Sequence, residues 1–378
     1  MTLLDAFLIN EFMTKGKRIY SKLNEKGLIQ PLPQADPEPE DGKITFGSGH
    51  PVKAIEKFIG YYNPEMKIAY SPSLSFCTDF SITRSYCLYN KKEGRDLVHL
   101  DGNYSEERTA TAKKALDIFR HITGIRGSFV FYVERERKYI KAKGMSESSS
   151  VAAAVARSLV SNIYGSKLKG IELMTSRFAK FVSGSGTRSS ISGLSLWTSF
   201  PGIEEKDCYA HPLKFDPSAV SIAVFPKFAN FSTNQMHEAS VNSPQYPAWL
   251  ENKYSSIERL IDNDFPIDDL MSRAEEEMLN LNSILMSVGK ILQTEDSLAL
   301  IERIVSFRKK NPGLYFTTDT GPSVLVMSRD RKLLDEFLDS ESDYYIRGRI
   351  MDKNVQHNSD PFKERARGFF SDFMNLSI

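Results

Sequence analysis

The chain has 378 residues, with 49 lysines and arginines against 48 aspartates and glutamates, so its formal net charge is +1. This balance gives no basic surface of the kind that binds nucleic acid, and no apolar run reaches the ~18 residues that a membrane-spanning helix needs. The length predicts two domains, and three cysteines without CxxC spacing predict a cytoplasmic protein with neither a disulfide framework nor a zinc site. The six histidines are too widely spaced to predict a metal centre of nitrogen ligands.

The first 42 residues are predicted to form an extension that precedes the main body, made of a helix and a linker. Apolar side chains recur in it at near-helical spacing, with lysines opposite: Leu4, Leu8, Phe12, Ile19 and Leu23. Such a helix could bind a membrane surface or a partner, or could pack on the protein's own body, and its modest amphipathicity favours packing. The proline-rich acidic run at 31–42 then predicts a semi-rigid linker.

From Ile44 onward, short apolar runs alternate with helical periodicities, which predicts an α+β protein. Strands are expected around Ile68, Phe76, Tyr86 and Val98, and over 128–133, 220–225, 314–318 and 324–327. Helices are expected from Asn103 to about Ile122 and over 148–163, 246–263, 267–291, 295–309 and 330–338. The strand at 220–225 predicts the boundary between a first domain at 43–220 and a second at 221–345. The tail at 346–378 has too weak a periodicity to predict an element.

One arginine ends a serine- and glycine-rich turn over Ser183–Ser190, whose sequence is SGSGTRSS. Backbone of this kind lets a ligand approach closely, and a guanidinium can grip a carboxylate with two parallel hydrogen bonds. Arg188 could instead only brace its loop, but the glycines favour ligand contact. Ser183, Ser185 and Thr187 are the accompanying candidates for substrate binding.

A single carboxylate stands at the end of a predicted strand, in the run Thr318-Asp319-Thr320-Gly321-Pro322. Aspartate is common in turns for purely structural reasons. A carboxylate and a planar cation on two separate loops, however, suit a substrate that carries its own carboxylate and changes charge during reaction. Asp319 is therefore a candidate catalytic residue.

These two motifs resemble the fingerprints of the mevalonate diphosphate decarboxylases, a branch of the GHMP small-molecule kinase superfamily, which read Gly-Ser-Gly-Ser-x-x-Arg-Ser and Phe-Asp-Ala-Gly-Pro. The resemblance covers about residues 44–340. It implies the GHMP fold, with a ribosomal protein S5 domain 2-like N-terminal domain and a ferredoxin-like C-terminal domain. It also implies that Asp319 is the catalytic aspartate, that Arg188 aligns the substrate carboxylate, and that Ser185 binds the substrate.

A third family motif, Lys-Tyr-Trp-Gly-Lys, resembles Lys57-Phe58-Ile59-Gly60-Tyr61. The first lysine is kept, and Ser73-Leu74-Ser75 follows it as in the family, so Lys57 is expected to contact a substrate phosphate rather than solvent. The second lysine is replaced by Tyr61, which implies that the 5-phosphate is held differently. Tyr61, Lys141 and Lys143 are the candidates for that role.

The phosphate loop departs most from the family. Its relatives carry Pro-x-x-x-Gly-Leu-x-Ser-Ser at a helix N-terminus, whereas 141–150 reads KAKGMSESSS. Gly144 and Ser148 are kept, but Glu147 stands in place of the first serine. A carboxylate about 4 Å from a phosphate charge repels it by about 4 kcal/mol at an effective dielectric of about 20. Glu147 is expected to satisfy the helix amides itself, although a carboxylate could alternatively hold Mg²⁺ for ATP.

A kept reaction site beside an altered nucleotide loop resembles the ATP-independent branch of the family. The implied reaction converts mevalonate 3,5-bisphosphate to isopentenyl phosphate, CO₂ and phosphate with no cofactor and no metal. The alternatives are an ATP- and Mg²⁺-dependent mevalonate diphosphate decarboxylase, a mevalonate 3-kinase, and a pseudoenzyme that only binds an isoprenoid phosphate. A homodimer is the family expectation. Covering the vacated nucleotide cleft is one role open to residues 1–42.

Overall fold

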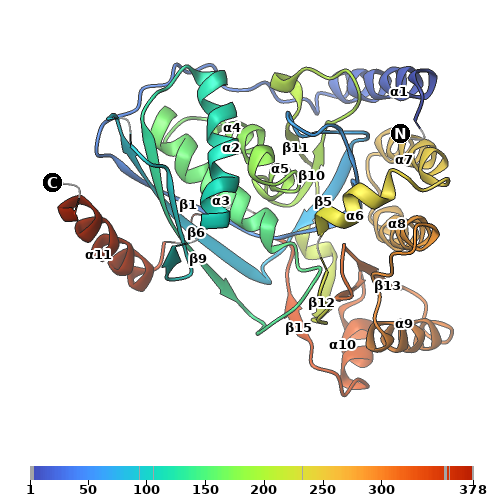
Figure 1. Cartoon of the computed structure of the whole chain (residues 1–378). Helices are drawn as coiled ribbons and strands as arrows, with labels where there is room; N and C mark the ends of the chain where they lie inside the picture. Colours follow the sequence, from blue (N-terminus) through green and yellow to red (C-terminus); the bar gives the residue numbers. More distant parts are fainter. Residues whose placement is uncertain are drawn as a thin grey trace.

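The computed structural model describes residues 4–376, apart from residues 93, 105, 232, 353–355 and 357. Within this part of the chain, helices and strands mix in an α+β arrangement of three larger sheets and one short two-stranded ribbon (Figure 1). No helix in it is both long enough and apolar enough to cross a membrane. The α+β class expected from the sequence is confirmed.

A five-stranded sheet with strand order β1-β6-β9-β7-β8 forms one side of the molecule. Its strands are β1 (Ile44–Gly49), β6 (Ser81–Asn90), β9 (Ser128–Arg137), β7 (Leu97–Leu100) and β8 (Asn103–Tyr104). One face is covered by α2 (Glu106–Thr123), α3 (Glu147–Tyr164) and α4 (Ile171–Val182) (Figure 1). Glycines in β1 allow α3 to approach closely, because a Cβ at Gly47 would lie 2.4 Å from the Ser158 backbone nitrogen. The apolar helix predicted at 148–163 is thus a buried helix.

A four-stranded sheet of order β11-β10-β5-β2 carries the first motifs of the site. It consists of β2 (Val52–Glu56), β5 (Ser73–Cys77), β10 (Leu194–Trp197) and β11 (Ala210–Leu213). The ribbon β3 (Tyr61–Asn63) and β4 (Ile68–Ala69) follows β2, and the short helix α5 (Gly186–Ser189) precedes β10. β5 pairs with β2 on one side and with β10 on the other. The segments that hold Lys57 and Arg188 therefore adjoin the two strands that flank β5.

The C-terminal part has an antiparallel sheet of order β13-β14-β12-β15. Its strands are β12 (Ser221–Phe225), β13 (Leu314–Thr318), β14 (Val324–Ser328) and β15 (Ile346–Gly348). Its helices are α6 (Thr233–Ser240), α7 (Tyr246–Asp262), α8 (Ile267–Ser287), α9 (Glu295–Arg308) and α10 (Arg331–Asp339). These agree closely with the predicted elements, but β15 pairs with β12, so the sheet reaches beyond the domain end predicted at 345.

The N-terminal helix α1 (Ala6–Glu25) lies along α7 (Figure 1). Phe12 stacks on Tyr254 with ring centroids 5.4 Å apart, and an exposed row of ion pairs flanks this contact, including Lys22 with Asp262 at 2.8 Å. Each such exposed pair stabilises by about 0–1 kcal/mol, so the buried apolar stripe is the main attachment. The helix packs on the protein's own body, as the sequence favoured, and it contributes no lining to the site cleft.

The C-terminal helix α11 (Asp360–Leu376) is not predicted from the sequence. It lies on the face of the five-stranded sheet opposite α3 (Figure 1), where Phe362, Ala366 and Phe370 are buried against Val130 and neighbouring side chains of β6 and β9. The i, i+4, i+8 spacing of those three residues is the helical signal that the tail contains. The tail therefore closes the outer face of a sheet that would otherwise expose apolar side chains.

Candidate active site

A cleft of about 1060 Å³ opens where β2, the N-terminus of α3, the serine–glycine turn and the β13–β14 turn meet. Ten of the residues predicted for the site line it: Lys57, Tyr61, Lys143, Gly144, Glu147, Ser148, Ser183, Ser185, Arg188 and Asp319. They come from segments more than 260 residues apart in the sequence, so the fold brings both loop motifs and the altered phosphate loop to one place.

Two predicted residues are not brought to the cleft. Thr187 is fully buried, and its hydroxyl donates to the Gly184 carbonyl within its own turn. Lys141 is exposed, and its ammonium stands 3.9 Å from the centre of the Phe228 ring. The predicted substrate contacts of Thr187 and Lys141 are therefore not supported, because both side chains are directed elsewhere.

Asp319 is held from both of its oxygens at the floor of the cleft. Its Oδ1 accepts from the Ala54 backbone amide at 3.2 Å and its Oδ2 from the Ser146 hydroxyl at 3.2 Å. The ammonium of Lys53, 1% exposed, lies 3.5 Å from Oδ2 and also donates to the Gly144 carbonyl. A carboxylate with these partners keeps one orientation while its remaining lone pairs face the cleft.

Arg188 is buried to 2% exposure, yet its guanidinium is only partly used by the protein. One terminal nitrogen donates to the Ser75 hydroxyl, and the ring of Phe58 lies 5.5 Å from the guanidinium carbon. Its Nε has no protein partner although it is buried. Burial lowers the pKa of Arg188 to about 10, and the Asp319 carboxylate opposes that shift. An unpartnered, desolvated donor on a planar cation is suited to an anionic ligand.

Lys57 presents an ammonium at the wall between β2 and β13. Its Nζ donates to the Ala54 carbonyl at 2.7 Å and to Thr317 Oγ1 at 3.0 Å, which leaves the third N–H for a ligand. Burial lowers the pKa of Lys57 to about 8, and the nearby Asp319 carboxylate opposes the shift. The side chain is thus protonated in most molecules at neutral pH, and its charge is weakly solvated.

A buried cluster of four charges supports Lys57 from behind. It consists of Glu56 from β2, Lys253 from α7, and Arg273 and Glu277 from α8. Lys253 bridges the two carboxylates at 3.0 and 2.8 Å, and Glu277 also accepts the backbone N–H of Lys57 at 3.2 Å. Removing one member would leave an uncompensated buried charge, so this cluster fixes the strand that carries Lys57.

Glu147 opens α3 at the altered phosphate loop, but it does not cap the helix amides as expected. Its carboxylate instead accepts from Arg137 at 2.7 Å, from Arg135 at 3.1 Å and from the Tyr139 hydroxyl at 2.9 Å. The correction has a geometric cause: β9 runs directly into this loop, so its two arginines reach the carboxylate first. The loop is therefore filled by an arginine-bound glutamate.

The loop is also fastened to the turn that carries Asp319. Gly144 has φ +84°, and a Cβ at Gly321 would lie 2.5 Å from the Gly144 backbone nitrogen. Two glycines are needed for this contact, because any side chain there would separate the loops. Ser146, itself in a left-handed conformation with φ +54°, completes the junction through its bond to Asp319.

Several lining residues could not be identified from motifs. They are Lys67 from the β3–β4 turn, Lys114 from α2 and His237 from α6. The buried Lys53, beside Asp319, was not identified either. His237 accepts from the Gly60 amide through Nδ1 at 3.0 Å and stacks on Tyr61, and burial lowers its pKa to about 4. Nothing in their local sequence distinguishes these side chains from surface residues; only the tertiary fold places them at the cleft.

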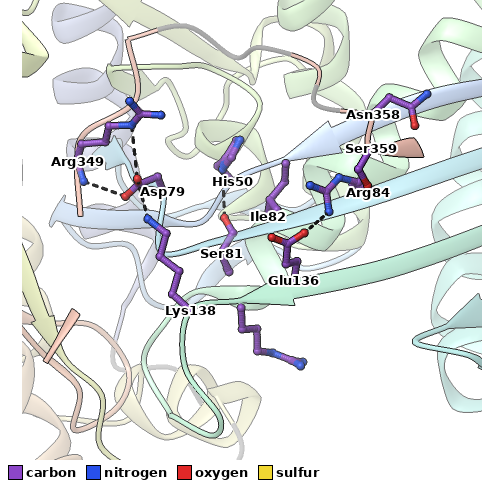
Figure 2. Close-up of a pocket in the computed structure, with 11 residues that line it drawn as sticks. His50, Asp79, Ser81, Ile82, Arg84, Glu136, Lys138, Arg349, Asn358 and Ser359 are labelled. Carbon is purple, nitrogen blue, oxygen red and sulfur yellow. Dashed lines mark hydrogen bonds and ion pairs between the residues drawn. The ribbon is translucent and has the colours of Figure 1, made fainter. Parts of the chain in front are cut away.

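A second hollow, of about 370 Å³, lies at one end of the antiparallel β6–β9 pair (Figure 2). Asp79 is flanked there by Lys138 at 2.8 Å and Arg349 at 3.5 Å, and Arg84 pairs with Glu136 at 2.7 Å. None of the residues predicted for the site lines it, and its carboxylates already engage these cations. Among the described residues, no group of three or more histidines, cysteines or carboxylates is placed to hold a metal ion.

Comparisons with known proteins agree with this geometry. Residues 49–210 match the model of the diphosphomevalonate decarboxylase-like N-terminal domain. A mevalonate 3,5-bisphosphate decarboxylase of Thermoplasma volcanium is 43% identical over 96% of this chain and 97% of its own length. The chain belongs to the mevalonate 3,5-bisphosphate decarboxylase family. Another member, from Thermoplasma acidophilum, is also 43% identical, over 96% of this chain and 90% of its own.

The fold of this family member is shared with more distant proteins. The mevalonate diphosphate decarboxylase of Staphylococcus aureus superposes with a TM-score of 0.70 at 20% identity, covering 82% of this chain and 96% of that one. At this level of identity the likeness concerns the fold alone.

Proposed function

We propose that the protein decarboxylates mevalonate 3,5-bisphosphate to isopentenyl phosphate, CO₂ and phosphate without ATP. One observation carries the proposal: Asp319, Arg188 and Lys57 share a cleft in which the former phosphate loop is filled by Glu147 and its arginines. The groups needed to expel CO₂ and phosphate are present, whereas the place for a nucleotide phosphate is taken. The relatives of the family carry the same activity in their names.

The proposed reaction breaks two σ bonds and forms two π bonds, the alkene C2=C3 bond and the second C–O double bond of CO₂. The C3–O bond breaks, and the 3-phosphate departs with its electron pair, leaving positive charge on the tertiary C3. The electrons of the C1–C2 bond then form the C2=C3 double bond, and C1 leaves as CO₂. The substrate arrives with the 3-phosphate already attached, so no phosphoryl donor is consumed.

Each of the three residues has a defined task in that sequence. Asp319, fixed by Ala54 and Ser146, stabilises the cationic carbon, because its charge is oriented before the reaction starts. The free N–H of Lys57 neutralises the departing phosphate. Arg188 aligns the substrate carboxylate through its unpartnered donors, so that the C1–C2 bond can supply electrons to the forming alkene. Ser183 and Ser185, with hydroxyls 3.2 Å apart, are the neighbouring substrate contacts.

The experiment is to supply mevalonate 3,5-bisphosphate to the purified protein in EDTA, after enzymatic removal of contaminating nucleotides. We expect isopentenyl phosphate and inorganic phosphate in a 1:1 ratio. Turnover that appears only when Mg·ATP is added, with isopentenyl diphosphate formed from mevalonate diphosphate, would select the ATP-dependent alternative. Binding without any product would select the pseudoenzyme.

The same proposal includes the finer architecture. The C-terminal strands, taken in chain order, lie in the sheet order 2-3-1-4, which supports a ferredoxin-like second domain after an S5 domain 2-like first domain. We also keep a cytoplasmic location, which the three unpaired cysteines support, and a homodimer, which sedimentation equilibrium would test.

A further inference from the structure

Two lysines line the cleft without an ion pair to any of its carboxylates. Lys67 lies in the β3–β4 turn and Lys114 on α2, and both line the cleft. Among the residues that the structure describes, neither ammonium forms an ion pair or a hydrogen bond with the protein. Burial, and next the charge of Lys114, lowers the pKa of Lys67. The fold therefore holds two like charges close enough to repel each other.

Lys67 is also held in an unfavourable backbone conformation. Its φ is +54°, in the left-handed region that residues other than glycine rarely occupy. This conformation fits the last position of the tight β3–β4 turn, and it fixes the point from which the Lys67 side chain leaves the backbone.

The ring of Tyr61 supports Lys67. The Lys67 ammonium lies 4.9 Å from the centre of that ring, a distance at which the ring face attracts a cation. Tyr61 is the residue that stands where the resembling motif has its second lysine. Position 61 therefore carries no cation here, and the ammonium of Lys67 stands over the aromatic ring found at that position.

The order of charges along the cleft matches a substrate with two anionic ends. The Phe58 ring lies 5.5 Å from the guanidinium carbon of Arg188 and 5.6 Å from the ring of Tyr61, and the Lys67 ammonium lies 4.9 Å from the Tyr61 ring. Arg188, the two aromatic rings and Lys67 are therefore successive contacts within the cleft, which Asp319 and Lys114 also line. A substrate with its carboxylate at Arg188 and its tertiary carbon at Asp319 would direct its far end past these rings.

We infer that Lys67 and Lys114 form the subsite for the 5-phosphate of the substrate, with Tyr61 as the platform of Lys67. This inference rests on the proposed function. It differs from the sequence prediction that Lys141 and Lys143 hold the 5-phosphate. The ammonium of Lys141 lies over the ring of Phe228, and the negative charge that acts on Lys143 is that of Glu147. A phosphate monoester dianion relieves the repulsion between the two ammonium groups and supplies the ion-pair partner that neither lysine has within the described protein.

The test measures the binding of two ligands, each of which lacks one of the two phosphates of the substrate. Mevalonate 5-phosphate lacks the 3-phosphate leaving group, and mevalonate 3-phosphate lacks the 5-phosphate. Calorimetric titration of Lys67→Met and Lys114→Met should show mevalonate 5-phosphate bound about 10- to 100-fold more weakly than by the wild type, as for a lost charge-assisted bond. Binding of mevalonate 3-phosphate should change less than twofold. Lys67→Arg should retain most of the affinity for the 5-phosphate.

The matched control is Lys113→Met, which removes an exposed lysine next to Lys114 that does not line the cleft, and which should bind both ligands as the wild type does. Equal weakening of both ligands, unchanged binding of mevalonate 5-phosphate, or failure of the wild type to bind it would each overturn the subsite. Because binding is measured without turnover, these outcomes are separate from the proposed function. A wild type that decarboxylates normally while Lys67→Met binds normally would leave the function standing and remove the subsite.

Discussion

Two carboxylates at the N-terminus of α3 are treated differently by the protein. Asp319 is bound by a backbone amide and a serine hydroxyl and is 7% exposed, and one buried lysine stands beside it. Glu147 is bound by two arginines and a tyrosine. The first keeps its orientation and its charge available to a ligand, whereas the charge of the second is already neutralised. The protein thus leaves the charge of Asp319 open to a ligand and pairs the charge of Glu147 with its own arginines.

This difference changes the physical reason for excluding a nucleotide. A bare carboxylate would repel phosphate by Coulomb interaction, but the charges of Arg135 and Arg137 largely offset that of Glu147. Under the proposed function, phosphate is excluded by occupancy, because the arginines and helix end that could bind an anion are already beside a protein carboxylate. The following predictions would sharpen or break this contrast, beginning with the largest effect.

Replacing the poised carboxylate should have the largest effect. Asp319→Asn keeps the shape of the side chain but removes the charge that stabilises the cationic carbon, so kcat should fall about 10³-fold. Substrate binding, measured by calorimetry, should change much less. The control is Asp339→Asn at the exposed end of α10. A fall of less than tenfold in kcat would show that Asp319 is not the stabilising charge.

Arg188 should come next. Arg188→Met removes the donors that align the substrate carboxylate and should lower kcat/KM about 10²-fold, with KM raised. Arg188→Lys should recover only a minor part, because an ammonium cannot reproduce a planar two-point contact. Equal activity of the lysine variant and the wild type would contradict alignment by the guanidinium.

The pH dependence of kcat/KM should reflect the protonation of Lys57. Its pKa in the folded protein is about 8, so kcat/KM should fall about tenfold per pH unit above that value as the ammonium loses its proton. Lys57→Arg should move this limb to higher pH. In stability the sign is opposite: burial of the charged form costs stability below pH 8, and that cost is relieved as pH rises from 8 toward the ordinary value of 10.5. A profile that stays flat to pH 10 would remove Lys57 from the leaving-group role.

The smallest effect on decarboxylation should come from the occupied loop. Glu147→Ser removes the shorter ion pair of Arg137 and leaves Arg135 paired with Asp101, so Mg·ATP should bind at least about tenfold more tightly, whereas turnover of mevalonate 3,5-bisphosphate should change less than threefold. Glu136→Gln, which releases Arg84 instead, is the matched control. Unchanged nucleotide binding in Glu147→Ser would mean that something other than this glutamate closes the site.

The sequence predicted much of the fold and the reaction end of the site, because these depend on local patterns. Periodicity located α3, α7 and the β13–β14 pair, and turn chemistry singled out Arg188 and Asp319, although Arg188 lies in the short helix α5 and not on a loop. What it could not supply are partners that meet only in three dimensions. Lys53 is an ordinary lysine in a strand until the fold buries it beside Asp319, and Lys67 becomes notable only through its backbone conformation and its neighbour on α2.

The altered loop shows the same limit. The position of Glu147 indicated that nucleotide binding is changed, but its partners Arg135 and Arg137 lie on β9, a strand whose apolar part dominated the sequence pattern. The helix in the C-terminal tail was not predicted, for a different reason. The apolar stripe of α11 is present in the sequence, but the uncovered face of the sheet that it packs against is not visible there.

The most direct measurement compares two reactions of one enzyme preparation. Release of labelled CO₂ is followed from mevalonate 3,5-bisphosphate in EDTA and from mevalonate diphosphate with Mg·ATP. The account predicts rapid release in the first and none above background in the second. Release only in the second reaction would show that the loop still serves a nucleotide and would contradict the account.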